Sequence, residues 1–292
     1  MAKKIRGVMF EENLKNSMGL EFYNLSHRFG YQSPNWPYFE DVKIERIHYM
    51  AKSGVLSQRI TTSMHNTTHI DAPAHVIQGT PFIDEVPLPH FFGSGIVVSI
   101  PKNKWEPITG DDLEKACGKI IRPRDVVIVN TGWHKFYEDS EDYFCRAPGF
   151  VPSAGEWFVK KKVKVVGHDT QANDHPLATA IGPQRNGPLH PHLAEEYREW
   201  SGGRDWKDDF PEWSRCTVSC SRTASWASRT SAAISTRSPA SAALSRIFRG
   251  TGIAVTDVSC AWSLSSIRNK NSVSKRGVNS HDRPQTLRRK TI

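Results

Sequence analysis

The sequence predicts an α/β domain with a mixed central sheet and helices packed against it. Residues 95–100 form a β-branched run that ends at a proline, and residues 126–130 are apolar enough for a strand buried on both faces. Between these runs, residues 111–116 begin with acidic side chains directly after Thr109-Gly110. This pattern is typical of a helix N-terminus, where the helix dipole favours negative charge.

Later segments continue the same alternation of helix and strand. Ser153 and Glu156 have the spacing of a capping box, which predicts a helix that runs to about residue 161. A strand over residues 163–166 follows, and His168 and Asp169 lie at its carboxyl end, where α/β sheets place functional groups. We expect one of these two side chains to face the substrate; the alternative is a hydrogen-bonded turn in the core. A helix over residues 190–200 and a charged loop over residues 202–211 complete the predicted domain.

A chain of 292 residues is long enough for one large domain or two small ones, with an ample core. We divide it into a loosely held arm at residues 1–19, a domain at residues 20–214 and a tail at residues 215–292. No run of eighteen apolar residues occurs, so we expect no membrane span, and the N-terminus lacks the apolar stretch of a secretory signal. The five cysteines have neither disulfide-framework nor zinc spacing, which favours a reducing cytoplasm.

The net charge of +9 is unevenly distributed. Residues 216–292 contain 13 Lys and Arg against two Asp and Glu, whereas the rest of the chain contains 26 against 28. A basic tail can indicate a nucleic-acid partner, which would bind with a steep salt dependence. The predicted domain itself is nearly neutral. We expect a small-molecule substrate and no nucleic acid, because a change of reading frame, considered below, would account for the basic tail.

One short segment decides the functional prediction. Residues 65–75 contain His65, His69, Asp71 and His75, the side-chain types that hold a divalent transition metal and act beside it. A turn-like backbone would direct the first three toward one point, and Pro73 would bring His75 to its edge. Three protein ligands leave a coordination position for water, as a catalytic metal requires.

The alternative is a polar loop whose histidines hydrogen-bond to backbone groups. Four donors within one short window disfavour it. The spacing also excludes His-Glu-x-x-His proteases and Cys-x-x-Cys zinc fingers. Aromatic side chains at Trp36, Phe82 and Trp133 are candidates for stacking on an aryl substrate, although core packing explains such residues equally well.

The run His-x-x-Thr-His-x-Asp-x-Pro-x-His at residues 65–75 resembles the motif of the cyclase family of metal-dependent hydrolases, which includes kynurenine formamidase and isatin hydrolase. The family motif has Gly where this chain has Thr67, so we expect a modestly different loop that keeps the ligands. The resemblance covers roughly residues 20–180, through segments at residues 23–27, 126–133, 152–159 and 163–169.

The resemblance implies a swivelling β/β/α fold and hydrolysis of a small amide, formamide or lactam, such as N-formylkynurenine from tryptophan catabolism or isatin. His65, His69 and Asp71 would hold Zn or Mn and lower the pKa of a bound water, while His75 would carry a proton to the leaving nitrogen. Relatives assemble as dimers or tetramers, and some bind a second metal through a downstream His and Glu that this chain does not visibly contain.

The tail from residue 216 holds 16 Ser and has no helical or alternating period, which is typical of an irregular or disordered segment. A second hypothesis is a change of reading frame near Ser214. Read one frame over, with permitted synonymous codons, this region spells text that resembles the family's last quarter. The nucleotide sequence tests this directly. A chain altered in this way is also a candidate for a degenerate family member that binds metal without turnover.

Overall fold

The computed structural model describes residues 21–23, 25–182 and 190–213, together with three short segments at residues 230–233, 251–255 and 264–268. The predicted arm at residues 1–19 and the remainder of the predicted tail lie outside the described residues. The proposed frame change therefore remains a question for the nucleotide sequence. Among the helices that are described, none combines the length and the apolarity needed to cross a bilayer.

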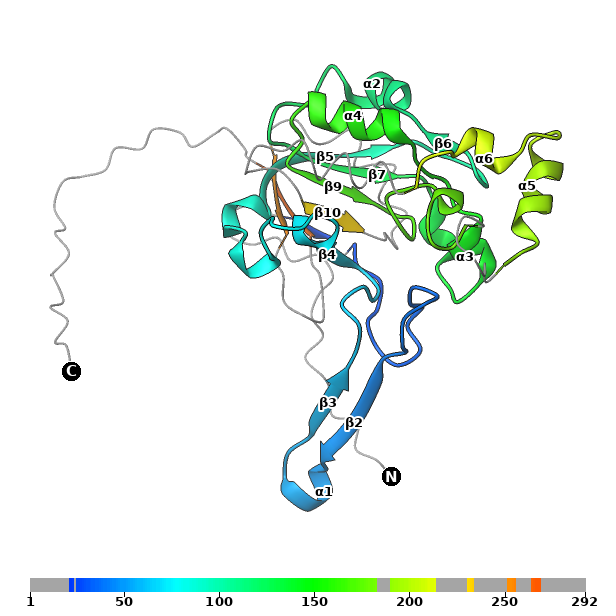
Figure 1. The fold of residues 1–292 in the computed structure, drawn as a ribbon. Coiled ribbons are helices and arrows are strands. Elements are labelled where there is room, and N and C mark those ends of the chain that lie inside the picture. The colour runs from blue at the N-terminus through cyan, green and yellow to red at the C-terminus, as the bar shows by residue number, and fades with distance from the viewer. Residues whose placement is uncertain are drawn as a thin grey trace, which may run out of the picture.

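An eight-stranded mixed sheet forms the centre of the molecule, in the order β1-β12-β11-β5-β7-β9-β10-β4 (Figure 1). Four neighbouring strands run parallel: β5 (Phe92–Ser99), β7 (Val126–Asn130), β9 (Val165–His168) and β10 (Thr230–Ala233). Antiparallel strands flank them: β4 (His69–Asp71) on one side, and β11 (Thr251–Val255), β12 (Leu264–Arg268) and β1 (Glu21–Tyr23) on the other. The predicted α/β class with a mixed sheet is confirmed.

Both faces of the central strands are buried. Every residue of β7 is buried: Val127 and Val129 belong to one core cluster, whereas Val126 and Ile128 belong to another on the opposite face. This division follows from the period of two along a strand. The uninterrupted apolar run of β7 therefore reflects its central position in the sheet.

Helices α2 (Gly110–Cys117) and α4 (Pro152–Lys160) cover one face of the sheet (Figure 1). Helix α2 begins as predicted, and the Thr109 side chain accepts a hydrogen bond from the backbone N–H of Asp112. The capping box predicted at Ser153 is wrong, because α4 begins at Pro152 and its N-cap residue makes no side-chain cap. The Ser153 hydroxyl instead accepts a hydrogen bond from the backbone N–H of Gly110, joining the two helix starts.

The remaining elements are short. The other helices are α1 (Met50–Ser53), α3 (Glu141–Cys145), α5 (Leu193–Trp200) and α6 (Trp206–Asp209). Two small sheets pair β2 (Lys43–His48) with β3 (Ser57–Thr61) and β6 (Pro107–Ile108) with β8 (Gly149–Phe150). Single 3-10 turns occur at Pro73–His75, Ile83–Glu85, Leu88–His90, Trp133–Phe136 and Pro176–Ala178. The predicted charged loop at residues 202–211 contains a short helix, α6. The strand predicted at residues 163–166 is β9, which ends two residues later, at His168.

The β2–β3 hairpin, with α1 at its tip, extends away from the body of the molecule (Figure 1). Several large apolar side chains along it are exposed. These are Ile47, Tyr49, Met50, Val55, Leu56 and Ile60. A two-stranded hairpin is at best marginally stable alone in water, so this apolar surface requires explanation.

A third core cluster, rich in aromatic side chains, packs around His175. Its ring stacks on Phe210, with the ring centroids 3.8 Å apart, and its Nε2 donates to the backbone carbonyl of Trp105. The other ring nitrogen accepts from the N–H of Leu177. Burial lowers the pKa of His175 to about 3, so the folded state keeps the ring neutral.

This depressed pKa predicts a specific loss of stability in acid. Between pH 6.5 and about 3 the unfolded chain protonates His175 and the folded chain does not, so the free energy of unfolding falls as the pH falls, by about 1.4 kcal/mol per pH unit. The free energy of unfolding, measured by urea titration at several pH values, should depend less steeply on pH in His175→Asn than in the wild type. The same change at the exposed His48 should leave this pH dependence as it is. An unchanged slope in H175N would contradict the assignment.

Candidate metal centre and cavity

Strand β4 places two of the predicted ligands. Its three residues alternate, so His69 and Asp71 share one face while Ile70 is buried in the hydrophobic core. Antiparallel pairing with β10 fixes the backbone at this end of the sheet. His69 and Asp71 therefore point to the same side of the strand, because Ile70 between them points to the opposite side.

The turn before β4 brings in the third ligand. Thr67 adopts a left-handed conformation with φ of 52°, which a residue with a β-branched side chain seldom adopts. The turn is held by the Thr68 hydroxyl, which accepts a hydrogen bond of 3.0 Å from the backbone N–H of His27. Glycine adopts this conformation without strain, and with Thr67 at this position the turn still places His65 beside His69.

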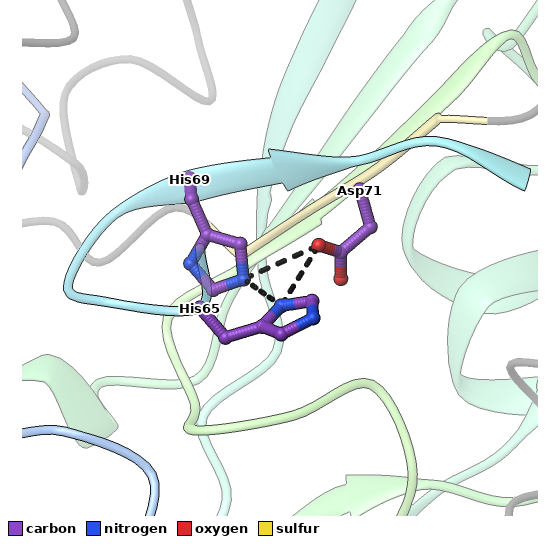
Figure 2. Close-up of side chains that lie close together, drawn as sticks. All are labelled: His65, His69 and Asp71. Atoms are coloured by element: carbon purple, nitrogen blue, oxygen red, sulfur yellow. Dashed lines mark hydrogen bonds and ion pairs between the residues drawn. The ribbon is translucent and has the colours of Figure 1, made fainter. Parts of the chain in front are cut away.

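Three donor atoms meet at one point (Figure 2). His65 Nδ1 lies 3.0 Å from His69 Nε2 and 3.0 Å from Asp71 Oδ1, and the last two atoms are 3.4 Å apart. Ligands about 2.0–2.1 Å from a tetrahedral metal lie about 3.3–3.4 Å from one another. The separations therefore fit one ion held by two imidazoles and one carboxylate, with room for a further ligand.

The surroundings of His69 and Asp71 favour the forms in which these two side chains bind a metal, whereas the hydrogen bond to Asp71 raises the pKa of His65. His69 Nδ1 donates to the backbone carbonyl of Thr67 at 2.8 Å, which leaves the lone pair on Nε2, the atom that faces the other donors. Burial raises the pKa of Asp71, but its hydrogen bond from His65 and the nearby imidazoles outweigh this effect and lower the pKa overall. Asp71 is therefore ionised at neutral pH.

His75 lies beside the triad and takes no part in it. Its Nδ1 is 3.2 Å from His65 Nε2, on the side of the His65 ring away from the donor atoms. Desolvation and the neighbouring imidazoles lower the pKa of His75 despite the opposing charge of Asp71. A neutral imidazole next to a metal ligand can accept a proton, which is the chemistry predicted for His75.

The triad and His75 form part of the wall of a cavity of about 480 Å³, within the usual range for small-molecule sites. Much of the remaining wall is aromatic, from Trp36, Phe39, Tyr137, Tyr143, Phe144 and Trp213. Polar groups follow the end of β9, beginning with His168. Burial lowers the pKa of His168 to about 4, so this imidazole is neutral as well.

Two of the five predicted substrate-contacting residues, Trp36 and His168, line this cavity. Phe82 and Trp133 lie outside its lining. Phe82 is 65% exposed, whereas Trp133 is buried in the aromatic cluster and donates its indole N–H to the carbonyl of Tyr143. The surrounding chain sets these positions. The local sequence around Phe82 and Trp133 does not show which ring is exposed and which is buried.

Asp169 also lies outside the cavity lining, in the hydrogen-bonded core turn that was the alternative interpretation. Its carboxylate is fully buried and accepts hydrogen bonds from Thr131, Gly132 and His134 in the turn after β7. Burial raises its pKa, but these hydrogen bonds outweigh burial and lower the pKa overall. The carboxylate thus joins the ends of two neighbouring strands.

Several cavity residues were not predicted from the sequence. The rings of Phe39 and His65 stack with their centroids 5.7 Å apart, and the rings of Tyr137 and His27 stack with their centroids 3.4 Å apart. Gln171 and Asn173 line the cavity after β9. The aromatic residues lack a distinguishing pattern, but the two amides lie immediately after a predicted strand end, which was a usable signal.

A second group, Glu141, His190 and His192, also brings three donor atoms within 4.8 Å of one another. Its carboxylate already contacts the Arg146 guanidinium at 2.9 Å in addition to both imidazoles. The neighbouring positive charge disfavours a cation, so we interpret this surface group as an ion-pair network that joins α3 to the start of α5.

Comparison with known families agrees with the motif. The model of the Cyclase family matches residues 23–175, which include the donor triad, His75 and the loop after β9. The chain belongs to the Cyclase family. The cyclase resemblance drawn from residues 65–75 is confirmed, and the family's motif corresponds here to a strand and a turn at the sheet edge.

Solved structures with the same fold include two isatin hydrolases. Isatin hydrolase A from Labrenzia aggregata, bound to benzyl benzoate, is 16% identical, with a TM-score of 0.58 over 85% of this Cyclase-family chain and 94% of that one. Isatin hydrolase A from Ralstonia solanacearum is 18% identical, with a TM-score of 0.59 over 85% and 92%. A predicted metal-dependent hydrolase from Bacillus stearothermophilus is 15% identical, with a TM-score of 0.54 over 84% and 98%.

The triad predicts the effect of removing one donor. His69→Ala removes a ligand and leaves two donors, so bound Zn²⁺ or Mn²⁺ should fall from about one equivalent to a trace after dialysis, as measured by elemental analysis. The matched change His48→Ala, in the hairpin, should keep the wild-type metal content. Full metal content in H69A would show that the three donors do not hold the ion.

Proposed function

We propose that this protein is a metal-dependent hydrolase that cleaves a C–N bond in a small amide, formamide or lactam. One observation carries the proposal: three donor atoms lie close together in the wall of a mostly apolar cavity that contains several aromatic rings, with a neutral imidazole beside them. Membership of the Cyclase family and the shared fold of the isatin hydrolases support the same reaction class.

His65, His69 and Asp71 would hold the ion, and their nitrogen and oxygen donors suit Zn²⁺ or Mn²⁺. When bound, such an ion supplies a Lewis acid that acidifies water and polarises a carbonyl group. His75 would accept a proton from the water that adds to the carbonyl carbon, and would pass it to the nitrogen as the C–N bond breaks. Its lowered pKa keeps it in the accepting form at neutral pH.

The cavity supports a small aromatic substrate, such as isatin or N-formylkynurenine. Trp36 and Phe39 lie on the wall near the triad, and a volume of about 480 Å³ suits a ligand with one or two rings. We also propose a cytoplasmic location, since the five cysteines have neither disulfide-framework nor zinc spacing and the two that the structure describes, Cys117 and Cys145, are free.

The activity is tested by absorbance assays on N-formylkynurenine and on isatin, with protein loaded with Zn²⁺ or Mn²⁺. We expect turnover of at least one of the two, abolished by a chelator and restored by the metal. The H69A variant is the matched inactive control. Stoichiometric metal without any turnover would support instead a degenerate family member that binds metal only.

His75→Gln separates proton transfer from metal binding. Glutamine keeps a polar side chain of similar size but cannot carry the proton, so kcat should fall by about 10²- to 10⁴-fold while the metal content stays at the wild-type level. Elemental analysis and steady-state kinetics on the same preparation measure both quantities. A kcat within a few-fold of wild type would remove His75 from the proposed mechanism.

We propose that the protein forms a homodimer or a tetramer through the projecting hairpin. The exposed apolar side chains of β2, α1 and β3 lie together on an element that has little core of its own. Burying them against a second copy would remove this apolar surface from water and stabilise the hairpin.

The double substitution Met50→Glu and Val55→Glu places two charges on this apolar surface, where they oppose burial. Sedimentation analysis should show the wild-type oligomer shifting to monomer in the double variant. Lys52→Glu, at an exposed and already charged position of the same tip, should leave the oligomer intact. A wild-type protein that sediments as a monomer would refute the proposed assembly.

A further inference from the structure

Thr67 combines backbone strain with a place in the cavity wall. In the described part of the chain, five residues other than glycine have a positive φ, and Thr67 is the only β-branched residue among them. It is also the only one of the five that lines the cavity. A β-branched residue in the left-handed region destabilises the folded chain, and such strain is found most often at functional sites.

The contacts that hold this turn do not require a threonine side chain. The Thr67 carbonyl accepts a hydrogen bond of 2.8 Å from His69 Nδ1, and the preceding residue, Asn66, pairs with Asn35 in an isolated β-bridge. Both contacts fix the backbone. Glycine would keep the same carbonyl in place without strain, so the shape of the turn does not account for the threonine.

Thr67 lies where a side chain can limit the space next to the metal centre. It is two residues from His65 and two from His69, it lines the same cavity as both, and it is partly exposed. Phe39, which stacks on the His65 ring, borders the cavity as well. A threonine carries a methyl group and a hydroxyl group on a stiff Cβ, so it fills a volume that glycine would leave open.

We propose that the Thr67 side chain restricts the width of the group that binds beside the metal centre, which makes Thr67 a specificity-determining residue. The inference rests on the proposed function, because the restricted group is the one that the metal would hold. It narrows the substrates to compounds whose reacting group carries a flat or unbranched substituent. It also gives a reason for a strained threonine in this turn.

Two hydroxamates of different width test the restriction without requiring turnover. Acetohydroxamate and pivalohydroxamate share one metal-chelating group, but the first carries a methyl group and the second a tert-butyl group. A tert-butyl group is wide in every direction, so the test does not depend on how the probe is oriented. Calorimetric titration of the Zn²⁺-loaded wild type should give at least tenfold tighter binding of acetohydroxamate, although added methyl groups favour binding where space allows.

Thr67→Ala and Thr67→Gly separate the volume of the side chain from the strain of the backbone. Both variants remove the methyl and hydroxyl groups, so the ratio of the two Kd values should fall to within about threefold in each. Only T67G also removes Cβ, so its Tm should rise by about 1–3 °C, whereas T67A should show no rise. Both should keep the wild-type metal content. The control Thr62→Gly, at an exposed position outside the cavity lining, should leave the Kd ratio unchanged.

Each opposing result overturns the restriction. Similar wild-type affinities for the two probes, including no detectable binding of either, would do so, as would an unchanged ratio in T67A and T67G. Loss of metal from T67G, or a Tm no higher than that of T67A, would show that Thr67 serves the turn itself. Failure of the proposed function looks different. In that case the Kd ratio changes as expected, but the metal-loaded wild type hydrolyses neither N-formylkynurenine nor isatin.

Discussion

Burial of Ile70 is the constraint on which the candidate metal centre depends. The side chain enters the core between the sheet and its covering loops, and the strand period then directs His69 and Asp71 to the opposite face. A shift of β4 by one residue would bury both donors in the apolar core and expose the isoleucine. The hydrophobic effect therefore sets the direction in which His69 and Asp71 point, and no contact with a metal is needed to do so.

Electrostatics then adjusts the donors once they are in place. Asp71 stays ionised because the adjacent imidazoles outweigh the cost of its burial, and His69 presents the correct nitrogen because a backbone carbonyl binds the other. The left-handed turn at Thr67 supplies that carbonyl. The left-handed backbone at Thr67 and the hydrogen bond that its carbonyl accepts from His69 are thus coupled, and together they orient the His69 imidazole.

The two buried acid–base groups at the end of β9, His168 and Asp169, have different structural roles. Asp169 joins the ends of β7 and β9 through hydrogen bonds to the turn at Thr131, so it supports the wall from behind. His168, one residue earlier, faces the cavity and stays neutral. Both residues lie at a strand end, so the sequence pattern predicts either one as a substrate contact. Neighbouring residues along a strand point to opposite sides, so only one of the two lines the cavity.

The sequence by itself determined the fold class, the donor set and the family. The apolar runs of β5 and β7 and the capped start of α2 are local patterns, and residues 65–75 concentrate the candidate metal donors within one short segment. The tertiary structure alone decided which distant side chains complete the cavity. Trp36, Tyr137 and Gln171 come from separate loops, and their meeting depends on how the chain packs around the sheet. Phe82 and Trp133 are as aromatic as Trp36, and only long-range packing assigns one to solvent and the other to the core.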